Sequence, residues 1–208
     1  MTGVWVKPDA LPALQAYFGK IFPVAAGEYG LRSVFGLRPV SAYSGDFVPD
    51  LMFVNEWPSL EHFKQFLDDP RTKALIPQRD AAANRLVVTQ YSVPQERTVT
   101  LREGDIIEFG AMWIKPGKQA DLGAYYAKAV EIARKHALEP ITALNPVFAY
   151  SGDFAPDRAG LNLWRTMDNF RAFANEAESI FRERDAALNR LVVTHAAVQF
   201  AAEADAAA

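Results

Sequence analysis

The feature that most constrains the fold is an internal repeat within the 208 residues. Residues 42–50 read AYSGDFVPD, and residues 149–157 read AYSGDFAPD. Residues 79–89 (RDAAANRLVVT) recur as residues 184–194 (RDAALNRLVVT), and residues 5–8 (WVKP) correspond to residues 113–116 (WIKP). The matching segments follow one order, which indicates a duplicated gene segment whose copies each have the size of a small domain.

The repeat divides the chain into a first copy at residues 1–93 and a second copy at residues 111–200, with a linker at residues 94–110 between them. In the linker, residues 98–101 and 106–109 alternate in polarity around Gly104, a pattern that favours a β-hairpin. We therefore expect an ordered linker. Residues 201–208 are rich in alanine and have little to bury, so we expect a frayed tail.

Composition excludes several classes of protein. Lys and Arg number 22 and Asp and Glu 25, a net charge of −3 without the basic clusters of a nucleic-acid binder. No apolar stretch approaches the ~20 residues of a membrane span, so neither nucleic acid nor membrane is an expected partner. The absence of cysteine excludes disulfides and thiolate metal sites, and the first residues lack a signal-peptide pattern, which together predict a cytoplasmic protein.

Each copy carries the same predicted order of elements. In the first copy, residues 4–6 form a strand, a helix capped by Asp9 follows, and Pro23 predicts a kink or an early end. Strands at residues 34–43 and 51–54, helices after Ser59 and Pro70, and a strand at 86–88 complete the copy. This order, β-α-β-β-α-β, is that of a ferredoxin-like unit.

The packing of the copies follows from the bare sheet face of such a unit. Both helices cover one face of a four-stranded antiparallel sheet, and the other, apolar face needs a partner. The second copy supplies that partner at high effective concentration. We therefore predict an α+β fold in which two ferredoxin-like sheets pack face to face as an intrachain pseudo-dimer.

Several motifs are similar to those of a known superfamily. Residues 45–49 (GDFVP), 56–61 (EWPSLE) and 69–70 (DP) resemble uncharacterised domain-of-unknown-function members of the dimeric α/β-barrel superfamily. Residues 115–118 (KPGK) and 163–165 (LWR) look more like its NIPSNAP-type members. The resemblance implies the fold rather than a reaction, because the superfamily includes cofactor-free oxygenases, isomerases, lyases, haem enzymes and proteins without known activity.

Two asparagines are candidates for a ligand site. Asn55 and Asn162 each lie within a predicted central strand and share a face with the tryptophan two residues later. The functional interpretation is a mostly apolar pocket for a small aromatic or carbonyl ligand. The alternative is that the tryptophans belong to the core and each asparagine pairs with backbone. If Trp5 and Trp57 share a face, the pocket residues are Trp5, Asn55 and Trp57 in the first copy and Trp113, Lys115, Asn162 and Trp164 in the second.

One difference between the copies favours a cavity in the second. Gly160 corresponds to Phe53, so a phenyl ring is replaced by hydrogen in a central strand. The second copy would then hold the working pocket, with the first copy as scaffold. A glycine there is equally typical of a bulge or a close backbone approach.

The histidines and the repeated turns give the remaining candidates. His195 lies on a strand and can point into a cavity, whereas His62 and His136 are expected on exposed helix faces. No metal triad and no axial haem ligand can be assembled, so we expect no cofactor. Tyr43 and Tyr150 precede Ser-Gly-Asp turns and are candidate pocket donors, although the turns themselves favour a structural role.

The sequence thus predicts a protein that binds a small apolar or aromatic ligand and that can also form a homodimer. The enzyme hypothesis is a cofactor-independent oxygenase, isomerase or lyase that acts on a small aromatic or carbonyl compound. Its catalytic residues would be Asn162, Tyr150 and His195, and its ligand-binding residues Trp113, Lys115, Gly160, Trp164, Trp5, Tyr43, Asn55 and Trp57. The competing hypothesis is a non-catalytic binding or structural module.

Overall fold

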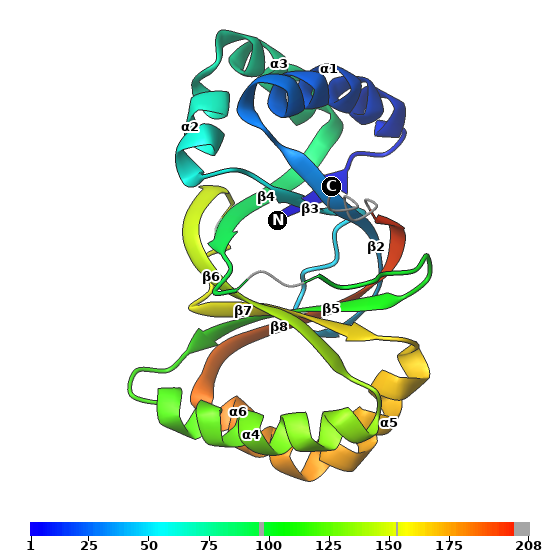
Figure 1. Ribbon diagram of the computed structural model, residues 1–208, viewed down its shortest axis with the longest axis vertical. Helices are drawn as coiled ribbons and strands as arrows, with labels where there is room; N and C mark the ends of the chain where they lie inside the picture. Colours follow the sequence, from blue (N-terminus) through cyan, green and yellow to red (C-terminus); the bar gives the residue numbers. More distant parts are fainter. Residues whose placement is uncertain (96–97, 153, 202–208) are drawn as a thin grey trace.

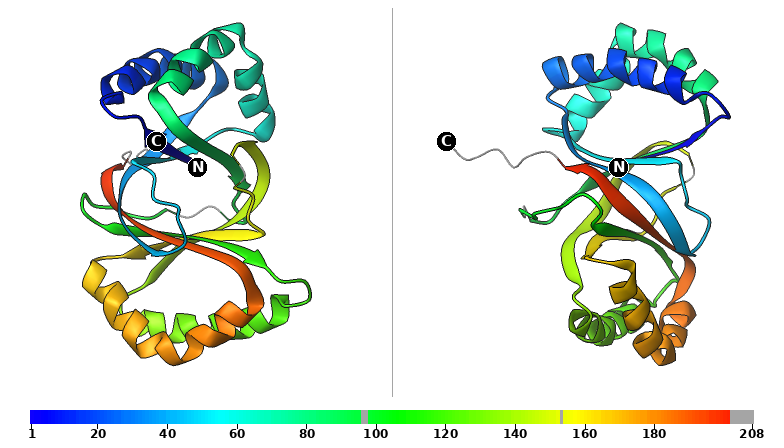
Figure 2. Two further views of the ribbon diagram at one scale, coloured as in Figure 1. Left: turned by 180° about the vertical axis from the view of Figure 1, so that it is seen from behind. Right: turned by 90° about the vertical axis from the view of Figure 1, so that its right-hand side faces the viewer.

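A computed structural model describes residues 1–95, 98–152 and 154–201. They form an α+β protein in which helices cover two opposite sides of a β-barrel (Figures 1 and 2). We call β1 to β4 with their helices the N-terminal half, and β5 to β8 with theirs the C-terminal half. Among the helices of the described residues, none combines the length and apolar character that a membrane crossing needs.

The two halves have the same order of elements. The N-terminal half contains β1 (Thr2–Val6), α1 (Leu11–Tyr29), β2 (Arg32–Ser44), β3 (Leu51–Glu56), α2 (Leu60–Asp68), α3 (Pro70–Ala82) and β4 (Ala83–Ser92). The C-terminal half contains β5 (Ile106–Ile114), α4 (Gln119–Lys135), β6 (Glu139–Ser151), β7 (Arg158–Trp164), α5 (Met167–Ala177), the short helix η1 (Glu178–Ile180), α6 (Phe181–Ala187) and β8 (Leu188–Ala201).

The strands close into one antiparallel barrel in the order β1-β3-β2-β8-β5-β7-β6-β4. The halves join at two seams, where β2 pairs with β8 and β4 pairs with β6. The two sheets face each other across a common core, as the sequence predicted, but they are also joined edge to edge, which the sequence did not predict. The reason is strand length: β2 and β6 have 13 residues each and β8 has 14, and their long edges satisfy one another's backbone groups.

The repeated Ser-Gly-Asp-Phe turns fill one end of the barrel. The rings of Phe47 and Phe154 lie in the core with centroids 4.6 Å apart. The Thr89 hydroxyl donates to the Phe154 carbonyl at 2.9 Å, and the Thr194 hydroxyl donates to the Phe47 carbonyl, so each turn is held by the other half. Gly45 is required at φ 74°, because a Cβ there would lie 2.8 Å from the Leu191 carbonyl oxygen. These contacts favour the structural interpretation of the turns.

Three local predictions were wrong. Asp9 does not cap α1, whose N-cap is Ala10 without a side-chain cap. The helix also continues past the exposed Pro23 to Tyr29, because its opposite face is anchored in the core. No hairpin forms around Gly104: residues 98–105 contain no strand, and the strand that begins at Ile106 pairs with β7 and β8 instead. The predicted frayed tail lies outside the described residues from position 202 onward, while Ala201 ends β8.

The helices pack differently on the two halves. In the N-terminal half, one continuous hydrophobic cluster joins the helices to the outer sheet face and includes Leu14 and Phe63, with Phe53 packed against it. In the C-terminal half, the corresponding contacts form two clusters, one around Met112 and the other around Trp164. The residues between these two clusters form the candidate site.

Candidate functional site

A gap interrupts the helix–sheet core of the C-terminal half. On the outer face of β5, Gly110 lies between Ile106 of one cluster and Met112 of the other, and it pairs with Gly160 of β7. A Cβ on Gly110 would meet no heavy atom within 4 Å, and one on Gly160 would meet only the Thr142 carbonyl oxygen at 3.5 Å. We call the open space beside Gly110 and Gly160 the glycine gap. Among the described residues, no side chain comes within 4 Å of these two Cβ positions, whereas Phe53 supplies a phenyl ring at the position that corresponds to Gly160.

A buried carboxylate lies one step along the same face of β5. Glu108 stands opposite Asn162 of β7 and His195 of β8, so three neighbouring strands converge on it. Asn162 Nδ2 donates to Glu108 Oε1 at 2.8 Å, and Trp164 Nε1 donates to Oε2 at 3.0 Å. His195 Nε2 lies 3.3 Å from Oε2. We call these four residues the Glu108 cluster.

The environment of Glu108 keeps its carboxylate charged. Burial raises the pKa of Glu108, but the contacts with His195, Asn162 and Trp164 outweigh burial and lower the pKa below its usual value. The His195 ring is fully buried, whereas the Glu108 side chain is 14% exposed. The Glu108 carboxylate is therefore ionised and, unlike the His195 ring, partly exposed to solvent.

Aromatic and basic side chains face the Glu108 cluster from the helices. The Arg184 guanidinium of α6 interacts with the Tyr125 hydroxyl of α4, and burial raises the pKa of Tyr125 to about 12. Tyr43 reaches this place from β2 of the other half and packs against the rings of Phe170 and Phe181, at centroid distances of 5.0 and 6.1 Å. The Tyr125 phenol is therefore a neutral hydrogen-bond donor near physiological pH.

The N-terminal half has a related site with different chemistry. A cavity of about 100 Å³ lies between its sheet and helices, and we call it the N-terminal cavity. Arg79 interacts there with the hydroxyls of Tyr17 and Tyr150, the latter contributed by β6 of the other half. Its lining also includes Asn55, Trp57 and Gln90. Gln90 occupies the position that corresponds to His195, so this cavity lacks the imidazole of the Glu108 cluster.

The structure brings together only some of the predicted site residues. Asn162, Trp164 and His195 meet at Glu108, with Gly160 nearby and Tyr43 opposite. Three other predicted residues line the N-terminal cavity, namely Asn55, Trp57 and Tyr150.

Three predicted residues lie elsewhere. Trp5 faces the barrel core and packs against Phe47 at 5.2 Å, so it does not share a face with Trp57, which packs against helix α2. Trp113 likewise packs against Phe154 at 5.1 Å. Lys115 Nζ donates to the Ala186 carbonyl at 2.9 Å and so binds the end of α6.

Sequence reasoning missed Glu108, Tyr125 and Arg184. Glu108 is the charged residue within an apolar segment, IIEFGAMWI, which is a usable signal for an inward carboxylate. Assigning residues 106–110 to a linker hairpin concealed it.

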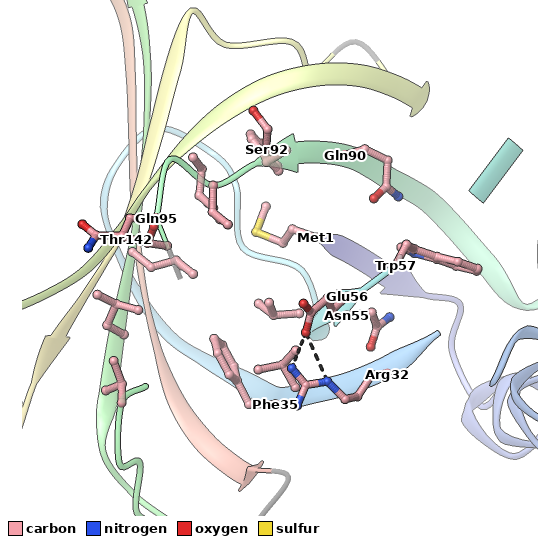
Figure 3. Close-up of a pocket in the computed structure, with 18 of the residues that line it drawn as sticks. Met1, Arg32, Phe35, Asn55, Glu56, Trp57, Gln90, Ser92, Gln95 and Thr142 are labelled. Atoms are coloured by element: carbon pink, nitrogen blue, oxygen red, sulfur yellow. Dashed lines mark hydrogen bonds and ion pairs between the residues drawn. The ribbon is translucent and has the colours of Figure 1, made fainter. Parts of the chain in front are cut away.

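A cavity larger than the N-terminal cavity lies at the other end of the barrel from the Phe47 and Phe154 turns. It measures about 1160 Å³ and is lined by β2, β3, β4 and β6 together with residues after β4 (Figure 3). We call it the barrel mouth. Asn55, Trp57 and Gln90 line both the barrel mouth and the N-terminal cavity, so they separate the two spaces.

The sequence matches no protein-family model, and a search of curated proteins found no match. Solved structures do resemble it. An anthrone oxidase-like protein is 14% identical, with 100% of this chain and 93% of that protein covered and a TM-score of 0.61. A protein of Fusobacterium nucleatum assigned provisionally as a monooxygenase is 9% identical, with coverages of 96% and 90% and a TM-score of 0.55. A protein assigned provisionally as a chlorite dismutase is 10% identical, with coverages of 96% and 92% and a TM-score of 0.55.

Likeness at this level of identity concerns the fold. The chain has the α+β fold of a dimeric α/β barrel, with both four-stranded sheets of the closed barrel supplied by one polypeptide. The similarity to NIPSNAP-type proteins is not confirmed by these matches. Among the described residues, no group of three or more His, Asp or Glu side chains could hold a metal ion.

Proposed function

We propose that the C-terminal half binds a small aromatic or carbonyl compound in the glycine gap and catalyses proton transfer with the Glu108 cluster. The observation that carries this proposal is a buried, ionised carboxylate beside open space in a helix–sheet core. Mostly apolar sites with a few oriented polar groups are typical of small-molecule binding. Buried carboxylates that contact an imidazole are common acid–base groups.

The position of each residue in the site indicates its role in the reaction. Glu108 accepts a proton from a carbon that the substrate carbonyl makes acidic, either next to the carbonyl or conjugated with it through an aromatic ring, while Asn162, Trp164 and His195 hold the carboxylate in place. Removal of the proton leaves an enolate, whose oxygen is stabilised by hydrogen-bond donors. The phenols of Tyr43 and Tyr125 and the guanidinium of Arg184 provide these donors from the side of the Glu108 cluster that faces the helices. This step is common to oxygenases, isomerases and lyases that need no cofactor.

Of the oxygenase, isomerase and lyase reactions, we infer that this protein catalyses oxidation by molecular oxygen. The support is that relatives in fold include an anthrone oxidase-like protein and a protein assigned provisionally as a monooxygenase. Anthrone is an aromatic ketone whose methylene carbon loses a proton readily, which fits the proposed role of Glu108. Its oxidation by one molecule of oxygen yields anthraquinone and one molecule of water, and the deprotonated ketone supplies the electrons.

The experiment compares anthrone oxidation in air by the wild type, Glu108→Gln and Asn162→Leu, followed by oxygen uptake and quinone absorbance against a buffer blank. We expect both variants to lose about 100-fold or more in rate, the usual contribution of a positioned acid–base group. Asn55→Leu is the matched control in the N-terminal half and should retain the wild-type rate. Oxidation no faster than the blank, or equal rates in all variants, would contradict the proposal.

A purely structural role of the Glu108 cluster, with no ligand, is the second candidate. The donors around Glu108 also satisfy a buried carboxylate that ties β5, β7 and β8 together, and the His195 ring is fully buried. Under this alternative, Glu108→Gln destabilises the fold but no aromatic ketone protects the wild type from thermal unfolding. Protection of the wild type that is lost in Asn162→Leu would exclude it.

We further propose that the halves descend from one duplicated unit, with the first copy at residues 1–93 and the second copy extended from residue 111 back to Ile106, where β5 begins. The support is the matched order of elements and the reciprocal Thr89–Phe154 and Thr194–Phe47 contacts. A cytoplasmic location follows from the absence of cysteine. Homodimerisation is a separate proposal, which light scattering of the purified chain tests directly.

A further inference from the structure

We propose that the barrel mouth is a second ligand site, which takes an uncharged, largely apolar molecule of two or more rings. It is independent of the Glu108 cluster, because it lies inside the barrel, whereas the cluster faces the helices of the C-terminal half. Its volume of about 1160 Å³ exceeds that of the N-terminal cavity, about 100 Å³. Ligand pockets generally occupy ~300–1000 Å³, so the barrel mouth has room for a ligand together with solvent at its entrance.

The two ends of the barrel are filled to different extents. At one end, Phe47 and Phe154 stack in the core, and Trp5 and Trp113 close over them in edge-on contacts. At the other end, the cavity extends inward between the strands (Figure 3). A barrel this small is ordinarily filled by its own side chains. An unfilled end therefore requires an explanation, and a bound molecule supplies one.

The inner wall of the barrel mouth is apolar. Phe35 and Leu144 belong to the barrel core and also line the cavity, and Val54 packs against that core from β3. Val99 and Leu101 add apolar surface from the segment that follows β4. An apolar ligand that replaced water here would gain roughly 25 cal/mol for each Å² of apolar surface removed from water.

The charges around the barrel mouth cancel: burial lowers the pKa of the Met1 amino group to about 5, so it is mostly neutral near pH 7. Arg32 and Glu56 are the charged side chains among its described lining residues, and they pair with each other, with Arg32 Nε donating to Glu56 Oε2 at 3.1 Å (Figure 3). An ionic ligand would have to lose water without gaining an opposite charge. Amide and hydroxyl groups on β4 and β6, from Gln90, Ser92 and Thr142, suit a single carbonyl or hydroxyl group on an otherwise apolar molecule.

The test uses two fluorescent probes that differ in charge. N-phenyl-1-naphthylamine is neutral, and 8-anilinonaphthalene-1-sulfonate adds a sulfonate to a similar ring system. We expect saturable, one-to-one binding of the neutral probe to the full chain, at least about tenfold tighter than binding of the sulfonate. Equal affinity for both probes would overturn the uncharged class, and the absence of saturable binding would overturn the site.

Substitutions inside and outside the barrel mouth test whether the neutral probe binds there. Val54→Phe narrows the barrel mouth and should weaken binding of the neutral probe about tenfold or more. Val48→Phe makes the same change at a valine that is 42% exposed and does not line the cavity, and it should have no effect. Thr142→Phe, from the opposite wall, repeats the test if Val54→Phe unfolds. Unchanged binding in a folded cavity variant, or loss of binding in Gly110→Val instead, would place the probe elsewhere and overturn the inference.

Discussion

At the scale of single residues, the Glu108 carboxylate makes stability depend on pH. Its pKa in the folded chain lies below the ordinary value of 4.5, so ionised Glu108 stabilises the fold above that pH, and this contribution is lost as the pH falls through the lower, folded-state value. We expect Glu108→Gln to lower the free energy of unfolding by about 2 kcal/mol at pH 7, because an amide cannot accept from all of the donors that surround the carboxylate.

Urea unfolding of the wild type and Glu108→Gln from pH 7 to pH 3 measures this contribution. The two curves should converge as the pH falls below about 4.5. Glu61→Gln is a suitable control, because that carboxylate lies on the exposed side of α2. A difference between wild type and Glu108→Gln that stays constant across the whole pH range would show that the charge of Glu108 has no stabilising role.

Part of this site could be predicted from the sequence. Because side chains alternate along a strand, Asn162 and Trp164 had to share a face, and the structure places both on the Glu108 carboxylate. The position of Tyr43 could not be predicted, since it depends on β2 pairing with β8 of the other half. The condition that Trp5 shares a face with Trp57 is not met, and the sequence left it open because periodicity does not say which side of a strand meets the helices.

At the scale of secondary-structure elements, contacts between residues that are distant in sequence explain why some of the predicted strands and helices were wrong. The segment from Ile106 alternates as a hairpin strand would, but its partners are β7 and β8, which are remote in sequence. Helix α1 tolerates Pro23 because Leu14, Ile21 and Ala25 remain buried on its other face. In both cases, contacts with residues distant in sequence outweigh the preference of the local sequence. Those contacts are visible only in the three-dimensional structure.

The glycines of β5 and β1 give a prediction at this scale. Gly110→Val places a side chain in the glycine gap and replaces the residue least suited to a strand, so we expect it to stabilise the fold by about 0.5–1 kcal/mol. Gly3→Val is the matched strand variant, but its Cβ would lie 2.8 Å from the buried ring of Phe47, and we expect a loss of about 1–3 kcal/mol. Denaturant unfolding of both variants measures these changes. A destabilised Gly110→Val would mean that the gap is not open.

At the scale of the whole molecule, closure of the barrel makes each half depend on the other. The seams pair residues 35–44 of β2 with residues 193–201 of β8, and residues 88–92 of β4 with residues 145–151 of β6. The reciprocal threonine contacts fasten each turn to the opposite half. The duplicated sequence favoured two sheets that shield each other. It did not reveal that the sheet edges join, because edge pairing between distant strands leaves no periodic signal in either copy.

A split chain tests this dependence. Residues 1–95 and 98–208, produced as separate polypeptides, should form a one-to-one complex when they are coexpressed, because the seams and the shared core need no covalent link. Each piece alone leaves the edges of two strands unpaired and the inner sheet face exposed, so we expect it to self-associate. Size-exclusion chromatography with light scattering, with the intact chain as reference, distinguishes these states. If either piece alone were a folded monomer, its sheet would be stable without the partner half, and the closed barrel would not be what holds this fold together.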